Sequence, residues 1–429
     1  MLPLPPDHAE RFVLADEVHA RPPVALDTPT RASYVALLVD AEDRPREQAH
    51  LAALCARFGV EPPAPGATHF LARLGALRVK WERHGEFSGC TFFADDAGPD
   101  LFAAPAAGLL PVGWLAGWPG RTLAAAHAEL GAGDDARWAG NFPATTFDGQ
   151  IVVGADIAEG AGRTFTDFRI HGDGFSRFVL LNRSLTPRQA GRMLQRLFEI
   201  EAYRMLALLA LPIARRQAPR IVEIEKALAR LTDAIAADSG GDEALLQALT
   251  RLAAEVESGL AASQFRFGAC RAYADLVARR IAELREGRLS GIQTIDEFMA
   301  RRFTPAVATC ATTSQRLHDL SERVAQASAL LSTRVDIARE RQNQALLASM
   351  DRRAKLQLRL QQTVEGLSVA AITYYVVGLV GYLGKALKSA GAPVDPDLLA
   401  GAALPLVAAA VLLALRRARG HLARREAGP

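Results

Sequence analysis

The sequence contains little cysteine and carries almost no net charge, and both shortages narrow the functions it could have. Its 4 cysteines lie far apart and form no CxxC pair. Such spacing argues against a disulfide framework or a cysteine metal site and fits a reducing cytoplasm. With 50 basic and 47 acidic residues, the formal net charge is only +3, so we expect no nucleic-acid partner.

Recognisable catalytic motifs are also missing. The sequence has neither a P-loop nor a strand-GxGxxG-helix pattern, and none of its 9 histidines forms an HExxH motif. No serine or cysteine stands in a known nucleophile motif. We therefore expect a protein that is not an enzyme and that uses no cofactor. The first residues lack an apolar run, so we also expect no cleavable signal peptide.

Two long runs with almost no charge dominate the C-terminal part of the chain. The first lies between Arg359 and Lys385 and contains Glu365 as its only charged residue. The second lies between Asp397 and Arg416 and contains no charged residue. Each run is close to the roughly 20 residues that a helix needs to cross a bilayer, and a helix satisfies its own backbone in lipid.

These runs predict two transmembrane helices, at about 364–383 and 398–415, within a membrane segment 363–415. The alternative is a buried hairpin in a soluble helical domain. Basic residues flank the pair on both outer sides, and such residues remain on the cytoplasmic side. We expect a multi-pass protein of the bacterial inner membrane, with the lipid bilayer as partner and both termini cytoplasmic. The flanking residues are Arg352, Arg353, Lys355, Arg359, Arg416, Arg417, Arg419, Arg424 and Arg425.

The remaining chain predicts an α+β protein with two further parts. Residues 1–183 alternate between strand and helix patterns and indicate a cytoplasmic α/β domain. Residues 184–290 then predict a bundle of long antiparallel helices, 291–362 a long stalk helix, and 416–429 a basic cytoplasmic tail. We expect strands at 32–39, 76–83, 87–93, 150–157, 163–171 and 176–182, and helices at 46–58 and 121–130.

Helix signals in the second half are strong. Thr186 and Pro187 form an N-cap followed by proline at the first helical position, and Thr294 with Glu297 matches a capping box. Leucines, valine and alanine at three-four spacing make a coiled-coil-like seam along the stalk. The seam packs either inside one chain or between the chains of a homo-oligomer. Its residues are Leu317, Leu320, Val324, Ala327 and Leu331.

Four segments of the chain resemble a bacterial family of uncharacterised membrane-anchored proteins, known as domain of unknown function 3422. The segments are EVHARPP (17–23), WERHGEFS (81–88), EAYRMLALLALP (201–212) and TVEGLSVAAITYYVVGLVGYL (363–383). The resemblance covers nearly the whole chain. It implies membrane anchoring and assigns no activity.

The order of the predicted elements is also similar to that of CorA-type divalent-cation transporters, in which the first span lines a pore. Those proteins carry a Gly-Met-Asn signature at the outer end of this span. Here the corresponding residues, 381–384, read GYLG. The resemblance therefore implies a topology and oligomer formation without ion selectivity. An oligomeric anchor or scaffold is our leading expectation, and a CorA-like channel is the alternative.

One side of the first predicted span carries polar residues at helical spacing. Glu365, Ser368, Tyr375 and Tyr382 fall on a single stripe, and polar stripes in membranes face other helices or water. This stripe either lines a pore or packs against other helices. Alternatively, Glu365 lies at the headgroup level and the tyrosines mark the membrane interface.

Two polar clusters in the N-terminal domain are weaker candidates. On a strand, Glu82, His84 and Glu86 would share one face and could bind an unspecified metal or act as acid and base. A metal-dependent enzyme is therefore a further alternative, although such residues are commonly solvated pairing partners. His19 and Arg21 could recognise a phosphate or carboxylate, or else brace the turn before the following prolines.

Overall fold

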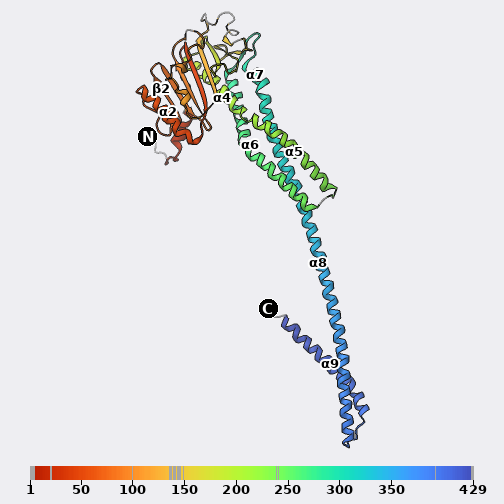
Figure 1. Cartoon of the computed structure of the whole chain (residues 1–429). Coiled ribbons are helices and arrows are strands. Elements are labelled where there is room, and N and C mark those ends of the chain that lie inside the picture. Colours follow the sequence, from red (N-terminus) through yellow and green to blue (C-terminus); the bar gives the residue numbers. More distant parts are fainter. Residues whose placement is uncertain are drawn as a thin grey trace. The chain divides into compact units, whose positions relative to one another are not determined.

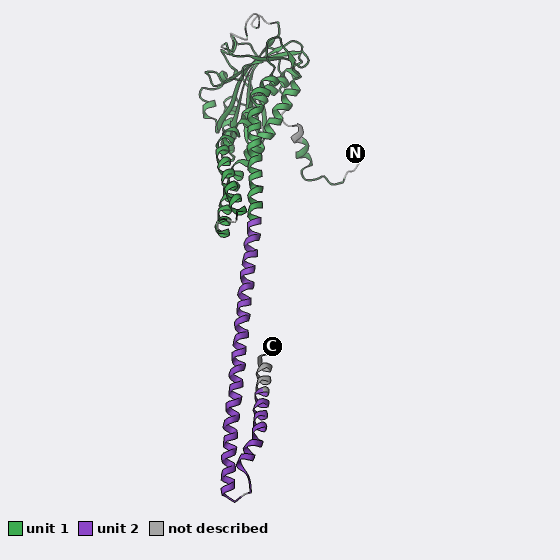
Figure 2. Ribbon diagram, turned by 90° about the vertical axis from the view of Figure 1, so that its right-hand side faces the viewer, with its two compact units in different colours: residues 1–329 green, residues 330–429 purple. Residues whose placement is uncertain are grey.

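A computed structural model describes residues 5–19, 22–98, 100–134, 138, 142, 146–147, 149–237, 239, 241–391 and 393–426. The chain divides into two compact units, Met1–Ala329 and Leu330–Pro429 (Figure 2). The first unit contains a β-sheet and long helices, whereas the second is helical. The fold is α+β, as the sequence predicts.

A 9-stranded sheet forms the centre of the first unit, in the order β2-β3-β4-β1-β5-β8-β7-β6-β9. Strand β5 pairs with β8 in parallel, and the other ladders between these described strands are antiparallel. The strands are β1 (Thr30–Leu38), β2 (His69–Leu74), β3 (Leu77–Arg83), β4 (Phe87–Ala94), β5 (Arg121–Ala132), β6 (Val153–Ile157), β7 (Gly162–Thr166), β8 (Ser176–Asn182) and β9 (Gly287–Arg288).

The expected helix at 121–130 is wrong, because this segment forms strand β5. Its alanine-rich sequence has high intrinsic helix propensity, but propensity is a weak prior. The segment lies between β1 and β8 in the sheet, and most of it is buried. Pairing on both edges therefore overrides the local preference. The expected strands at 150–157 and 163–171 are real but shorter, starting at Val153 and ending at Thr166 respectively.

Helices cover both faces of the sheet (Figure 1). One face packs with α2 and the short helices η2 and η3 around Trp81, Phe92 and Trp114. The other packs with α4, where Tyr34 of β1 stacks on Phe198 at 5.1 Å between ring centroids. Helices of this unit are α1 (Arg11–His19), η1 (Ala41–Asp43), α2 (Arg44–Arg57), η2 (Ala106–Leu109), η3 (Leu115–Gly117), α4 (Pro187–Leu208), α5 (Leu211–Ala236), α6 (Asp242–Leu284) and α7 (Ile295–Arg302).

Both predicted helix starts are confirmed. Thr186 and Thr294 each form a complete capping box, with Gln189 and Glu297 respectively. Helix α5 begins at Leu211, with Pro212 in its first turn, where proline is tolerated. Proline 219 instead lies inside α5, at the cost of one backbone hydrogen bond.

Helix α8 (Thr304–Ser389) belongs to both units. Within the first unit, the seam residues Leu317, Leu320 and Val324 are buried. A Cβ added to Gly259 of α6 would lie 3.5 Å from Leu317, so this part of the seam packs inside the chain. Further along α8, Leu346 and Met350 are exposed. For that part, contact between chains stays a prediction.

The second unit consists of the remainder of α8 and of α9 (Pro396–Glu426). The two predicted spans, 364–383 and 398–415, lie inside these helices, which extend beyond them. The helices come close where glycine removes a side chain. A Cβ at Gly384 would lie 3.1 Å from Cα of Pro396, and one at Gly381 would lie 3.8 Å from Cβ of Ala400. Glycine at these two positions therefore lets α8 and the start of α9 approach closely.

Candidate functional site

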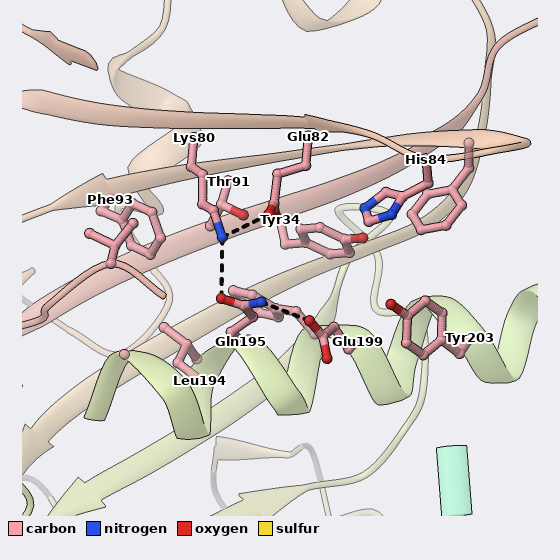
Figure 3. A pocket seen from close by; sticks show the side chains of 14 residues that line it. Tyr34, Lys80, Glu82, His84, Thr91, Phe93, Leu194, Gln195, Glu199 and Tyr203 are labelled. Carbon is pink, nitrogen blue, oxygen red and sulfur yellow. Dashed lines mark hydrogen bonds and ion pairs between the residues drawn. The ribbon is translucent and has the colours of Figure 1, made fainter. Parts of the chain in front are cut away.

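A small polar cavity lies between the sheet and α4 (Figure 3). Its volume is about 30 Å³, which is room for roughly two water molecules. Strands β1, β3 and β4 contribute to one side and α4 to the other. The lining residues are Val24, Tyr34, Lys80, Glu82, His84, Phe87, Thr91, Phe93, Gly191, Leu194, Gln195, Phe198, Glu199 and Tyr203.

Strand alternation places an ion pair in this cavity. Because successive side chains of β3 point to opposite faces, Val79 and Trp81 join the core under α2 while Lys80 and Glu82 face α4. Lys80 Nζ lies 2.9 Å from Glu82 Oε1, and the side chains are only 7% and 12% exposed. A buried ion pair loses hydration and is weak evidence for stability, which makes this pair a candidate for a functional role.

Hydrogen bonds connect this ion pair to the surface between α4 and α6. Lys80 Nζ donates to Gln195 Oε1 at 3.2 Å, and Gln195 Nε2 donates to Glu199 Oε1 at 2.8 Å. Glu199 in turn accepts from Nε of Arg280, whose Nη1 donates to Glu283 at 3.1 Å. Burial alone would lower the pKa of Arg280, but the Glu199 and Glu283 carboxylates outweigh it and raise that pKa.

The chain of bonds ends in a second, open cleft of about 340 Å³. Gln195 and Glu199 line both spaces and so form the partition between them. The cleft is lined by Pro23, Arg192, Gln195, Arg196, Glu199, Arg280 and Glu283.

Two tyrosines supply further donors to the inner cavity. Burial raises the pKa of Tyr34 and of Tyr203, and the Glu199 and Glu82 carboxylates raise both further, while Arg280 opposes the shift of the Tyr203 pKa. Both hydroxyls are therefore protonated and able to donate. In Figure 3 they point toward the side of the cavity where His84 lies. Tyr203 also stacks on Tyr273 of α6, at 5.7 Å between ring centroids.

The structure brings together only part of the first predicted polar cluster. Glu82 and His84 line the cavity, and His84 stacks on Phe87 at 4.3 Å. Glu86 does not share their face and instead pairs with Arg266 of α6. The reason is that β3 ends at Arg83, so the chain turns and strand alternation does not extend to Glu86. Among the described residues, no group of three or more His, Cys, Asp or Glu side chains could hold a metal ion.

The other predicted site residues lie elsewhere. His19 is the last residue of α1, and its side chain, like Arg21, lies outside the described residues. On α8, Tyr375 and Tyr382 are exposed, Ser368 Oγ donates to the carbonyl of Val364, and Glu365 is half-buried. A pore or packing role for this stripe stays a prediction.

Sequence reasoning missed a buried pair between neighbouring strands. Ser33 of β1 lies opposite His127 of β5, with 2.9 Å between Oγ and Nδ1. The backbone N–H of Ala107 donates to the same Oγ, so the serine hydrogen is free to point at the imidazole. The pair was hidden because His127 belongs to the segment expected to be helical. Both side chains are buried, so the pair joins β1, β5 and η2 and offers no nucleophile to solvent.

Because the imidazole of His127 is buried, we predict that the stability of the folded chain falls at acidic pH. Burial lowers the pKa of His127 from 6.5 to about 4, with Arg177 acting in the same direction and Asp173 opposing it. Below pH 6.5 the unfolded chain binds a proton that the folded chain does not, so stability falls as pH falls. The loss reaches about 2 kcal/mol between neutral pH and a pH of about 5.

Denaturant unfolding of the full chain and of His127→Gln at both pH values measures this loss. The variant is expected to lose less stability on acidification, because glutamine does not titrate. An identical pH dependence in the two proteins would contradict a role for His127.

Comparison with known proteins yields one finding. The model of DUF3422, described as a protein of unknown function, matches residues 6–422. No curated protein and no solved structure matches the chain. None of these comparisons supports the similarity to CorA-type transporters.

Proposed function

The chain belongs to the DUF3422 family of proteins of unknown function, and we propose that it is an oligomeric anchor or scaffold of the bacterial inner membrane. The end of α8 and α9 insert as a helical hairpin. The sheet and long helices remain in the cytoplasm, attached through the exposed part of α8.

The exposure of the two apolar helices is the observation that carries this proposal. Both contain a window long and apolar enough to span a membrane, and 0% of either window is buried in the chain. A core hairpin of a soluble domain would be covered, whereas here Leu367, Leu379, Leu406 and Leu413 are all exposed. Exposed contiguous apolar surface of this kind needs lipid or another chain to cover it.

The proposed orientation rests on the basic flanks. The segment before the first span and the tail after the second are rich in arginine, and such segments stay in the cytoplasm. Oligomer formation is supported by the exposed Leu346, Leu347 and Met350 of α8, since apolar side chains on a helix outside the bilayer favour pairing with another helix.

Alkaline carbonate extraction of bacterial membranes tests the anchor. We expect the full chain to stay in the pellet and a chain ending at Gln362 to move to the soluble fraction, because the apolar hairpin is gone. A second variant, with arginine at both Val376 and Ala408, keeps the full length and should also be extracted, since a charge at the bilayer centre is costly. Extraction of the unmodified chain would overturn the proposal.

Topology needs its own measurement. A reporter active only in the periplasm should be inactive when fused after Glu426 and active when inserted in the segment between α8 and α9. The reverse pattern would exclude the proposed orientation while leaving the anchor intact.

A further inference from the structure

The open cleft between α4 and α6 has more positive than negative charge. It contains three arginines, Arg192, Arg196 and Arg280, against two glutamates, Glu199 and Glu283. Both glutamates are already engaged, Glu199 by Arg280 and Glu283 by Arg280 and Arg196. These same pairs neutralise Arg196 and Arg280, so the cleft keeps a net positive charge of about one unit, which attracts a negative group from outside the protein.

Arg192 carries the positive charge that the glutamates of the cleft do not neutralise. It is exposed, lies one turn before Arg196 on α4, and forms no ion pair with any residue that the structure describes. A guanidinium carries five donors in a planar fork that matches two oxygens of a carboxylate or phosphate. Arg192, beside two arginines that already pair with carboxylates, therefore gives this concave space a preference for oxyanions over neutral molecules.

The cleft is also connected to the interior. Its inner wall is the hydrogen-bonded pair Gln195 and Glu199, and Gln195 accepts from the buried Lys80. An oxyanion bound to Arg280 competes with Glu199 for that guanidinium. Because Glu199 accepts from both Arg280 and Gln195, a change at Arg280 would reach the partition beside the inner cavity. The buried Lys80–Glu82 pair thus lies at the inner end of a path that begins at the three arginines.

We propose that this cleft is a binding site for a small molecule carrying a phosphate or carboxylate group. Arg192, Arg196 and Arg280 hold the oxyanion, and the remainder of the molecule points toward Gln195 and Glu199. The volume of about 340 Å³ falls at the small end of the range of ligand pockets, which favours a metabolite over a polymer. Binding of this kind goes beyond anchoring and is independent of it.

Isothermal titration calorimetry of the full chain in detergent tests the site, with inorganic phosphate and succinate as separate probes at constant ionic strength. Saturable binding of phosphate alone indicates a phosphate ester, and of succinate alone a carboxylate ligand. Arg192→Gln is expected to weaken binding at least about tenfold, because a charge-assisted bidentate contact is lost. Arg188→Gln is the matched control, since Arg188 is exposed one turn earlier on α4 and does not line the cleft.

A second variant should change the affinity in the opposite direction. Glu199→Gln keeps the size of the side chain but removes the charge that competes for Arg280, so the probe should bind several-fold more tightly. If the probe were held only by non-specific attraction to a basic surface, Arg192→Gln and Arg188→Gln would weaken its binding equally. The proposal fails if neither probe saturates, or if Arg192→Gln and Arg188→Gln bind with the affinity of the unmodified chain.

Discussion

Replacing Gly191 with alanine is expected to destabilise the first unit by more than about 3 kcal/mol, a large part of the roughly 5 to 15 kcal/mol that stabilises a typical domain. A Cβ at this position would lie 1.7 Å from the carbonyl oxygen of Val24 and 2.9 Å from its carbon. Both are backbone atoms, which cannot rotate away as a side chain can. The segment is also held in place, because the N–H of Leu26 donates to the carbonyl of Pro187 at 3.0 Å.

Thermal unfolding of the full chain in detergent, followed by circular dichroism, measures this loss. The matched control is Gly268→Ala in α6, where an added Cβ would meet nothing within 4 Å. There the change should stabilise by up to about 1 kcal/mol, because alanine is the better helix former. If the Gly191→Ala protein had the same melting temperature as the unmodified chain, Val24 and Leu26 could not lie against α4.

Replacing Glu47 with alanine is expected to cost about 3 kcal/mol or more. The Glu47 side chain is completely buried in the core under α2. It accepts hydrogen bonds from Nε1 of Trp81 at 3.0 Å, from Oγ of Ser88 at 3.1 Å and from Nε1 of Trp118 at 3.3 Å. Its removal leaves three buried donors unsatisfied, each costing about 1 to 3 kcal/mol, in addition to a cavity.

Denaturant unfolding monitored by tryptophan fluorescence suits this variant, since two of the three donors are indoles. Glu47→Gln retains an acceptor oxygen and should lose less stability than the alanine variant. The control is Glu42→Ala, an exposed position in η1, expected to change stability by less than about 0.5 kcal/mol. Equal stability of Glu47→Ala and Glu42→Ala would contradict the assigned hydrogen bonds.

Several features of this protein follow from short stretches of sequence. The apolar runs near 364–383 and 398–415 identify two helices able to cross a membrane, because length and lack of charge are local properties. The capping boxes at Thr186 and Thr294 likewise depend on residues three positions apart. Alternation along β3 also places Lys80 and Glu82 on one face, where Glu82 lines the same cavity as His84.

Only the tertiary structure decided what surrounds these residues. Lys80 meets Gln195, which lies 115 positions away, and Arg280 meets Glu199 across two helices. The strand β5, with its buried His127, forms because β1 and β8 offer it backbone partners on both edges. Local propensity and spacing encode where a helix starts and how long it is. They do not encode which distant segments meet, because that depends on burying many side chains at once, and so the cavity and the arginine cleft were visible only in the fold.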